Sequence, residues 1–185
     1  MSPLRSYRLG LDSLVIESDD DLRTMRNLAN ILKYKLAVSG LRNSGDALKL
    51  AHAVRHLGDA YYYAGQIDVA EPCYVEALSI YRSRNDGRPL DVANAIRSYA
   101  VIKGEIGATD EARRLWQEAH DLYLSLDVSA GVAESAARLA LLAQLENDLQ
   151  QSNEWLAEAT EAAQTANDPE TSQFVSEVKA RIDAR

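Results

Sequence analysis

The 185-residue sequence predicts an all-α fold, a right-handed superhelix (α-solenoid) of stacked antiparallel helix hairpins. The main observation is a repeat. The pattern of residues 51–81 returns 42 residues later, so that Gly65 is matched by Gly107 and Ala70 by Ala112. A fixed period of this size is typical of repeat proteins, in which each unit buries its apolar face against its neighbours. The chain also has only four prolines and nine glycines, which agrees with a helical class.

Each unit is expected to consist of two helices joined by a tight turn. In the first unit Val54, Leu57, Tyr61 and Ala64 recur at spacings of three and four, which indicates one face of a helix. Gly65 is expected to end that helix, because glycine readily adopts the left-handed conformation of a C-cap. The second helix alternates small alanines with large aromatic residues, as helices that cross closely require.

A third, more degenerate unit follows at a spacing of 40 residues, with Asn147 in place of the turn glycine. Terminal units are expected to be degenerate because they have only one neighbour. We divide the chain into an N-terminal arm and capping helix (1–45), three repeats (46–87, 88–127 and 128–167) and a C-terminal capping helix (168–185).

Local signals predict where the helices begin. Ser18, which is followed by three aspartates, is expected to cap the first clear helix, which would end at Ser39-Gly40. Pro72 is expected near the first turn of its helix, where a missing amide costs least. Of the later helices, five are expected to begin at Ser44 or Asp46, at Ile67, at Pro89, at Leu149 and at Pro169. Thr109 is expected to cap the helix that ends near Leu126, and Asp127 or Ser129 the one after it.

The repeat residues carry a family resemblance. Leu57-Gly58, Tyr61, Ala70, Tyr74 and Ala77 in the first unit, and Tyr99-Ala100, Ala112, Trp116 and Ala119 in the second, resemble the tetratricopeptide repeat. The 42-residue period is similar to the longer variety found in kinesin light chains. The resemblance implies a concave groove that holds extended or helical peptides. Two departures are the missing unit-ending proline and Lys103, which stands where a tyrosine is usual.

Composition excludes several classes of partner. The net charge of −8 argues against a nucleic-acid groove or an acidic membrane surface. The single cysteine, Cys73, excludes an internal disulfide framework. No apolar run approaches the ~20 residues of a membrane span, and no signal peptide is recognised. We therefore expect a cytoplasmic protein.

Two arginines are the main candidates for binding. Arg55 and Arg97 hold equivalent positions in adjacent repeats, so they are expected on neighbouring helices about 10 Å apart, where both could grip a carboxylate. The alternative is that both pair with Asp59, Glu105 or Glu134 and only stabilise the stack. The predicted peptide-binding residues on the first helices are His52, Arg55, Asp59, Tyr62, Tyr63, Asn94, Arg97 and Val101.

A catalytic metal site is a third hypothesis beside binding and self-assembly. His52, His56 and Asp59 have a spacing that a metal site can use. The zincin motif, however, has a glutamate directly after the first histidine, and Arg55 would oppose a cation. We expect no catalytic site, no metal and no cofactor.

The predicted function is a non-catalytic protein-interaction scaffold that binds a peptide or helix, with acidic groups, in the concave groove. A different hypothesis is a self-assembling or regulatory module, for example a homodimer, that acts through its end caps or convex face. An exposed apolar stripe between Leu4 and Leu14 would support the second hypothesis. Either module could be a fragment of a larger regulator.

Overall fold

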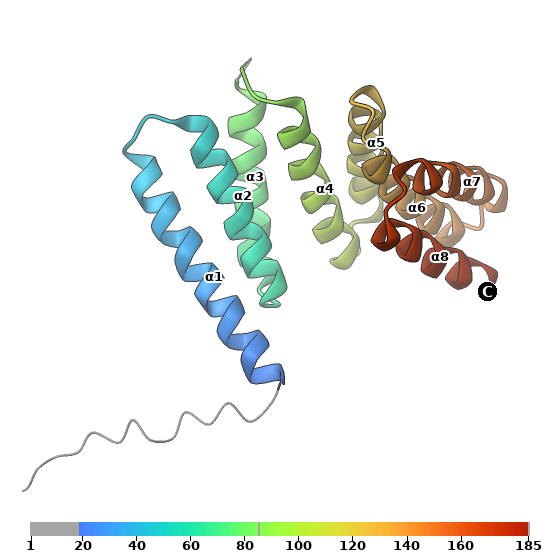
Figure 1. The fold of residues 1–185 in the computed structure, drawn as a ribbon, viewed down its shortest axis with the longest axis horizontal. Coiled ribbons are helices and arrows are strands. Elements are labelled where there is room, and N and C mark those ends of the chain that lie inside the picture. Colours follow the sequence, from blue (N-terminus) through green and yellow to red (C-terminus); the bar gives the residue numbers. More distant parts are fainter. Residues whose placement is uncertain (1–18, 85, 185) are drawn as a thin grey trace, which may run out of the picture.

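The computed structural model describes residues 19–84 and 86–184, which form eight α-helices and no strand (Figure 1). Three antiparallel hairpins, α2–α3, α4–α5 and α6–α7, pack in sequence, with α1 against α2 and α8 against α6 and α7. The expected all-α solenoid of stacked hairpins is confirmed. The helices are α1 (Asp19–Arg42), α2 (Ala47–Tyr63), α3 (Ile67–Arg82), α4 (Pro89–Glu105), α5 (Thr109–Ser125), α6 (Ser129–Leu145), α7 (Leu149–Ala166) and α8 (Pro169–Asp183).

Left-handed residues produce the short turns of the stack. Gly65 and Gly107 have φ angles of 73° and 77° inside the first two hairpins, and Asn147, with a φ of 61°, holds the same place in the third. The substitution of asparagine for glycine is therefore confirmed. The turns that follow the second and third hairpins use Asp127 and Asn167, with φ angles of 56° and 50°. Short polar side chains tolerate this conformation because they hydrogen-bond locally.

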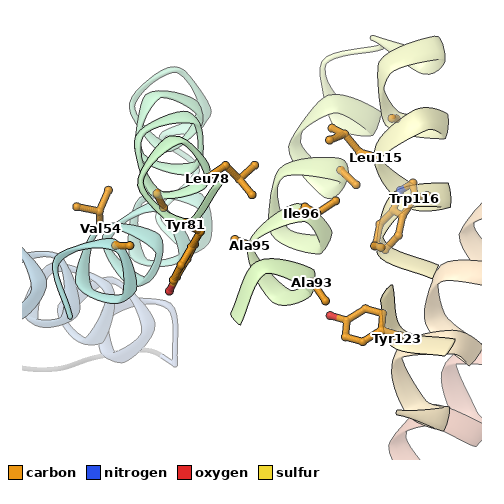
Figure 2. Packing of buried hydrophobic residues seen from close by; sticks show 14 of the residues in the cluster. Val54, Leu78, Tyr81, Ala93, Ala95, Ile96, Leu115, Trp116 and Tyr123 are labelled. Atoms are coloured by element: carbon orange, nitrogen blue, oxygen red, sulfur yellow. The ribbon is translucent and has the colours of Figure 1, made fainter. Parts of the chain in front are cut away.

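The core combines small and large residues across the helix interfaces. Figure 2 shows Leu78 of α3 directed toward α4, and Ile96 of α4 directed toward Leu115 and Trp116 of α5. Burial of such side chains stabilises the fold by about 1.5–3 kcal/mol each. The repeat alanines are completely buried, which lets the helix backbones approach closely; they are Ala51, Ala70, Ala77, Ala93, Ala112 and Ala119.

Several predicted helix boundaries are wrong. Helix α1 continues through Gly40 to Arg42. Leu41 packs against the core, and this packing outweighs the cost of about 1 kcal/mol for a glycine inside a helix. Thr109 is the first residue of α5 and not its cap. Asp127 lies in the turn, so neither it nor Ser129 caps α6 with a side chain.

Other local predictions have mixed outcomes. Asp46 caps α2, because the Lys49 amide donates to its Oδ1 at 3.0 Å. Pro72 lies inside α3 and beyond its first turn. Ser18 and the segment from Leu4 to Leu14 lie outside the described residues. Within residues 19–84 and 86–184, no helix is both long and apolar enough to cross a lipid bilayer.

Candidate binding groove

Two adjoining hollows lie along the first helices of the hairpins. The larger, with a volume of about 420 Å³, lies among α4, α6 and α8, and the smaller, of about 240 Å³, among α2, α4 and α6. Arg97, Glu134 and Arg138 line both hollows. Because the two hollows share these side chains, they form one groove, which is called the concave groove below.

Six of the eight predicted binding residues line the concave groove. Asp59, Tyr62, Tyr63 and Val101 line the smaller hollow, Asn94 lines the larger, and Arg97 lines both. His52 and Arg55 line neither hollow. The predicted surface therefore coincides largely with the two hollows, and it differs from them at His52 and Arg55.

Arg55 is committed to partners inside the stack. Its Nη1 donates to Asp59 Oδ2 at 3.0 Å and its Nη2 lies 2.9 Å from His56 Nε2, and the residue is only 9% exposed. The hydroxyl of Tyr74 donates to the other oxygen of Asp59 at 2.9 Å. This is the arrangement that the alternative reading describes, in which the arginine stabilises the stack. It leaves Arg55 no free face for an incoming carboxylate.

The same cluster controls the charge of Asp59. Burial by itself would raise the pKa of this carboxyl, but the hydrogen bond from His56 and the charge of Arg55 hold it below the ordinary value of 3.8. Asp59 is therefore ionised at neutral pH and neutralises Arg55. The smaller hollow consequently has an anchored carboxylate at its α2 side.

Arg97 has both an internal partner and an open side. Its Nη1 donates to Glu134 Oε2 on α6 at 2.7 Å, and its side chain is 38% exposed. This ion pair crosses from the second hairpin to the third and links their first helices. Arg97 thus stabilises the stack, as the alternative reading says, while it still faces both hollows.

Arg138 is the cation of the groove that the sequence analysis did not select. Its guanidinium carbon lies 5.7 Å from the ring centre of Trp116 and 5.0 Å from that of Phe174. Its Nε is buried without a hydrogen-bond partner, and no carboxylate in the described part of the chain forms an ion pair with it. The repeat alignment pairs Arg97 with Ala137 and so misses Arg138. The available signal was its spacing of four from Glu134, which places both on one helix face.

An aromatic and apolar patch completes the α2 side of the groove. Tyr62 donates its hydroxyl to Glu105 Oε1 on α4 at 2.6 Å, and burial together with this acceptor raises the pKa of Tyr62 to about 12. Its ring lies 5.4 Å from that of Tyr63, which is 70% exposed. Val101 adds apolar surface from α4. Flat aromatic surface of this kind suits a peptide side chain.

Helix α8 is a wall of the groove as well as an end cap. Thr171 and Phe174 line the larger hollow, and Phe174 makes a cation–π contact with Arg138. The sequence analysis assigned α8 only to capping. Its amphipathic pattern was visible, but its position against α6 is a property of the tertiary packing.

The histidines of α2 do not form a metal centre in the described residues. The Nε2 atoms of His52 and His56 lie 3.1 Å apart, with the Arg55 guanidinium against His56. Across residues 19–84 and 86–184, no group of three or more His, Cys, Asp or Glu side chains is arranged to hold a metal ion. These histidines contact Arg55, Asp59 and each other, and the ring of His56 also stacks on that of Tyr34 of α1 at 5.2 Å between ring centres.

Comparisons with known proteins establish the fold. No protein-family model matches the sequence, and no curated protein matches it. BtubC (BKLC) from P. vanneervenii is 15% identical, with a TM-score of 0.61 over 86% of this chain and 63% of that chain. Aspartyl phosphate phosphatase F from Bacillus subtilis is 10% identical, with a TM-score of 0.76 over 88% of this chain and 43% of that chain.

A third solved structure is matched over nearly its whole length. The N-terminal domain of stress-induced protein-1 (STI-1) from C. elegans is 19% identical, with a TM-score of 0.54 over 73% of this chain and 98% of that domain. The chain spans less than two thirds of the first two structures. At these identities the likeness concerns the fold alone, and the 42-residue repeat variety stays a prediction. The chain therefore has the fold of the tetratricopeptide-type helical repeat proteins.

Proposed function

We propose that this chain is a non-catalytic protein-interaction scaffold that binds a peptide or helix in the concave groove and recognises an acidic group of that ligand. The observation that carries the proposal is that the Arg138 guanidinium pairs with no carboxylate of the described residues. The other cation of the groove, Arg97, is neutralised by Glu134, and Arg55, which lies outside both hollows, is neutralised by Asp59. Arg138 has no such partner in the described residues.

The environment of Arg138 favours a carboxylate. A guanidinium that stacks on aromatic rings keeps its in-plane N–H groups available, and a carboxylate accepts two of them at once. Trp116 and Phe174 hold the Arg138 guanidinium by cation–π contacts, which leave its N–H groups available in the same way. Next to Arg138, the aromatic surface of Tyr62 and Tyr63 offers apolar contact for the rest of the ligand.

The groove favours binding over chemistry. Asp59 is held ionised by Arg55 and His56, and Glu134 is tied to Arg97. A general acid or base needs a pKa near the operating pH, and a carboxyl held below its ordinary pKa has the opposite property. One of the similar structures is named a phosphatase, but a likeness at 10% identity shows only that the two chains share a fold.

A synthetic peptide library tests the proposal. At one fixed position the peptides carry glutamate, glutamine or lysine, and binding to the full chain is measured by fluorescence anisotropy. We expect the glutamate peptides to be selected and their binding to weaken as salt is added, because screening shields exposed charges. Arg138→Gln should weaken binding by about 10- to 100-fold, as expected when a hydrogen bond to a charged group is lost.

The matched control is Arg88→Gln. Arg88 lies outside both hollows, its side chain is 78% exposed, and it pairs with Asp91. This variant should bind as the wild type does. A library that yields no binder, selection that ignores the fixed charge, or an Arg138→Gln variant with unchanged affinity would each contradict the proposal.

A further inference from the structure

Helix α1 has apolar residues on two opposite faces. Its inner face packs against α2 through the buried Ile31 and Val38. With 3.6 residues per turn, a second set of apolar positions lies on the opposite side of the helix, and these side chains are 45–66% exposed. This second set, called the α1 stripe below, consists of Leu22, Met25, Leu28, Leu32 and Leu36.

The α1 stripe is unusual for the end of a solenoid. End helices of repeat proteins normally present a polar outer face to water. The opposite end of this molecule obeys that rule, since α8 has no large hydrophobic residue among the exposed ones. In Figure 1, α1 is the outermost helix at its end of the row, so no other helix of residues 19–84 and 86–184 covers the stripe.

The first two turns of α1 also lack support from the stack. Asn27 Nδ2 donates to the carbonyl of Tyr63, the last residue of α2, at 2.8 Å. The part of α1 before Asn27 therefore extends past the end of α2, as Figure 1 shows. Residues 19–26 are all exposed. A helix gains most of its stability from packing of an apolar face, so this part needs a partner from outside the stack.

We infer that the α1 stripe is a dimerisation surface that packs against α1 of a second copy in antiparallel orientation. Charge favours this occupant. The first two turns of α1 hold Asp19, Asp20 and Asp21 together with Arg23, which pairs with Asp20, and Arg26, so their net charge is −1. Residues 31–42 hold the exposed Lys33 and Lys35 and no carboxylate, so the other end of the helix is basic. An antiparallel pair places the acidic end of each helix beside the basic end of the other. The surface is thus self-complementary, as a two-fold symmetric interface requires.

The exposed area fits a weak to moderate dimer. The α1 stripe exposes roughly 500 Å² per copy, which is within the range of about 300–600 Å² for the largest patches on monomers, patches that often have a function. Burying it on both copies removes about 1,000 Å² from water, close to the lower limit for a specific interface. We therefore expect a dissociation constant in the micromolar range. The stripe does not line the concave groove, so a dimer leaves the groove open.

The test is the molar mass of the full chain in solution, measured by light scattering after size exclusion over about 10–300 µM, a range chosen for a micromolar dissociation constant. The wild type should approach twice the 20.4 kDa of one chain as concentration rises. The double variant Leu32→Glu, Leu36→Glu should stay at the mass of one chain. Both leucines are at least 60% exposed, so circular dichroism should show unchanged helicity.

A matched control removes the same kind of side chain elsewhere. Leu145 at the end of α6 is 55% exposed and does not belong to the stripe, so Leu145→Glu should dimerise as the wild type does. Orientation is tested in a Cys73→Ser background by mixing Leu22→Cys and Leu36→Cys chains under mild oxidation. Antiparallel packing should give the crosslinked 22–36 heterodimer in preference to either homodimer.

Three results would overturn the inference. The first is a wild type that stays at the mass of one chain throughout the concentration range. The second is loss of the dimer in the Leu145→Glu control. The third is a chain that dimerises only after residues 1–18 are deleted, which would mean that this segment covers the stripe. The Arg138→Gln variant should dimerise normally, so failure of this inference and failure of the groove proposal are distinguishable.

Discussion

The same substitution at three helix glycines should have three different effects on stability. A Cβ at Gly131 of α6 would lie 2.5 and 2.6 Å from Cδ1 and Cδ2 of Tyr123, and it would also meet Cγ. A Cβ at Gly58 of α2 would lie 3.0 Å from the ring of Tyr74. At Gly104 of α4 nothing lies within 4 Å of the added atom. The series therefore separates helix propensity from close packing.

The Tyr123 ring cannot easily move away from an added methyl group. Its exposed fraction is 2%, and its hydroxyl donates to Asn94 Oδ1 at 2.8 Å. Replacing glycine by alanine inside a helix gains up to about 1 kcal/mol in propensity. Overpacking a closed site costs about 1–3 kcal/mol or more. Because the contact at Gly131 is with several ring atoms at once, we expect Gly131→Ala to lose about 2 kcal/mol net.

Thermal unfolding followed by far-ultraviolet circular dichroism measures the series. For a chain of this length, 1 kcal/mol corresponds to about 2–4 °C in Tm. Gly131→Ala should lower Tm by about 4–8 °C, Gly104→Ala should raise it by about 1–3 °C, and Gly58→Ala should fall between them. A Gly131→Ala variant as stable as Gly104→Ala would refute the reasoning. It would mean that the close packing of Tyr123 against α6 is not the reason for a glycine at position 131.

Three further predictions concern the buried polar groups and the turns. Asp59→Asn leaves the Arg55 guanidinium without its carboxylate, so it should destabilise the chain by about 2–4 kcal/mol. The pKa of Asp59 is lowered in the fold, so its contribution is present above pH 3.8 and lost as pH falls below it; wild type and variant should converge in acid. A stability difference between wild type and Asp59→Asn that stays the same from neutral to acidic pH would contradict this. Burial raises the pKa of the Cys73 thiol to about 11, so alkylation at pH 8 should be about 100-fold slower than for a free cysteine, and a rate plateau near pH 9 would argue against it. Asn147→Gly should keep the Tm, while Asn147→Ala should destabilise by about 1 kcal/mol, since alanine disfavours the left-handed φ of 61°; equal unfolding curves for the two variants would disagree.

Much of the fold could be predicted because its signals are local. A left-handed turn needs glycine or asparagine, so Gly65, Gly107 and Asn147 mark the hairpin turns in the sequence itself. A helix crossing needs small residues, and the repeat alanines supply them at a fixed period. The boundary errors arose where packing outweighed local preference. Gly40 suggested a helix end, but Leu41 has a place in the core and the helix continues.

The candidate site was less predictable because charges pair across helices. Position 103 shows this clearly. Lys103 departs from the tyrosine usual in the repeat, and the structure places its Nζ 2.5 Å from Glu71 on α3 and 3.0 Å from Glu111 on α5. Nothing in the neighbouring sequence indicates these partners. Arg55 and Arg97 looked equivalent by repeat position, yet one is enclosed by the stack and the other faces the groove.

The sequence by itself determined the order of helices, the turns and the stacking of hairpins, because the spacing of apolar, small and left-handed residues acts within one unit and repeats along the chain. Only the tertiary structure decided which cation in the groove has no acidic partner and which face of α1 stays uncovered. The Arg138 guanidinium contacts the rings of Trp116 on α5 and Phe174 on α8. The α1 stripe is exposed because α2, the main neighbour of α1 among the described residues, packs on the opposite face. Such properties depend on distances between side chains far apart in the sequence, which a one-dimensional pattern does not contain.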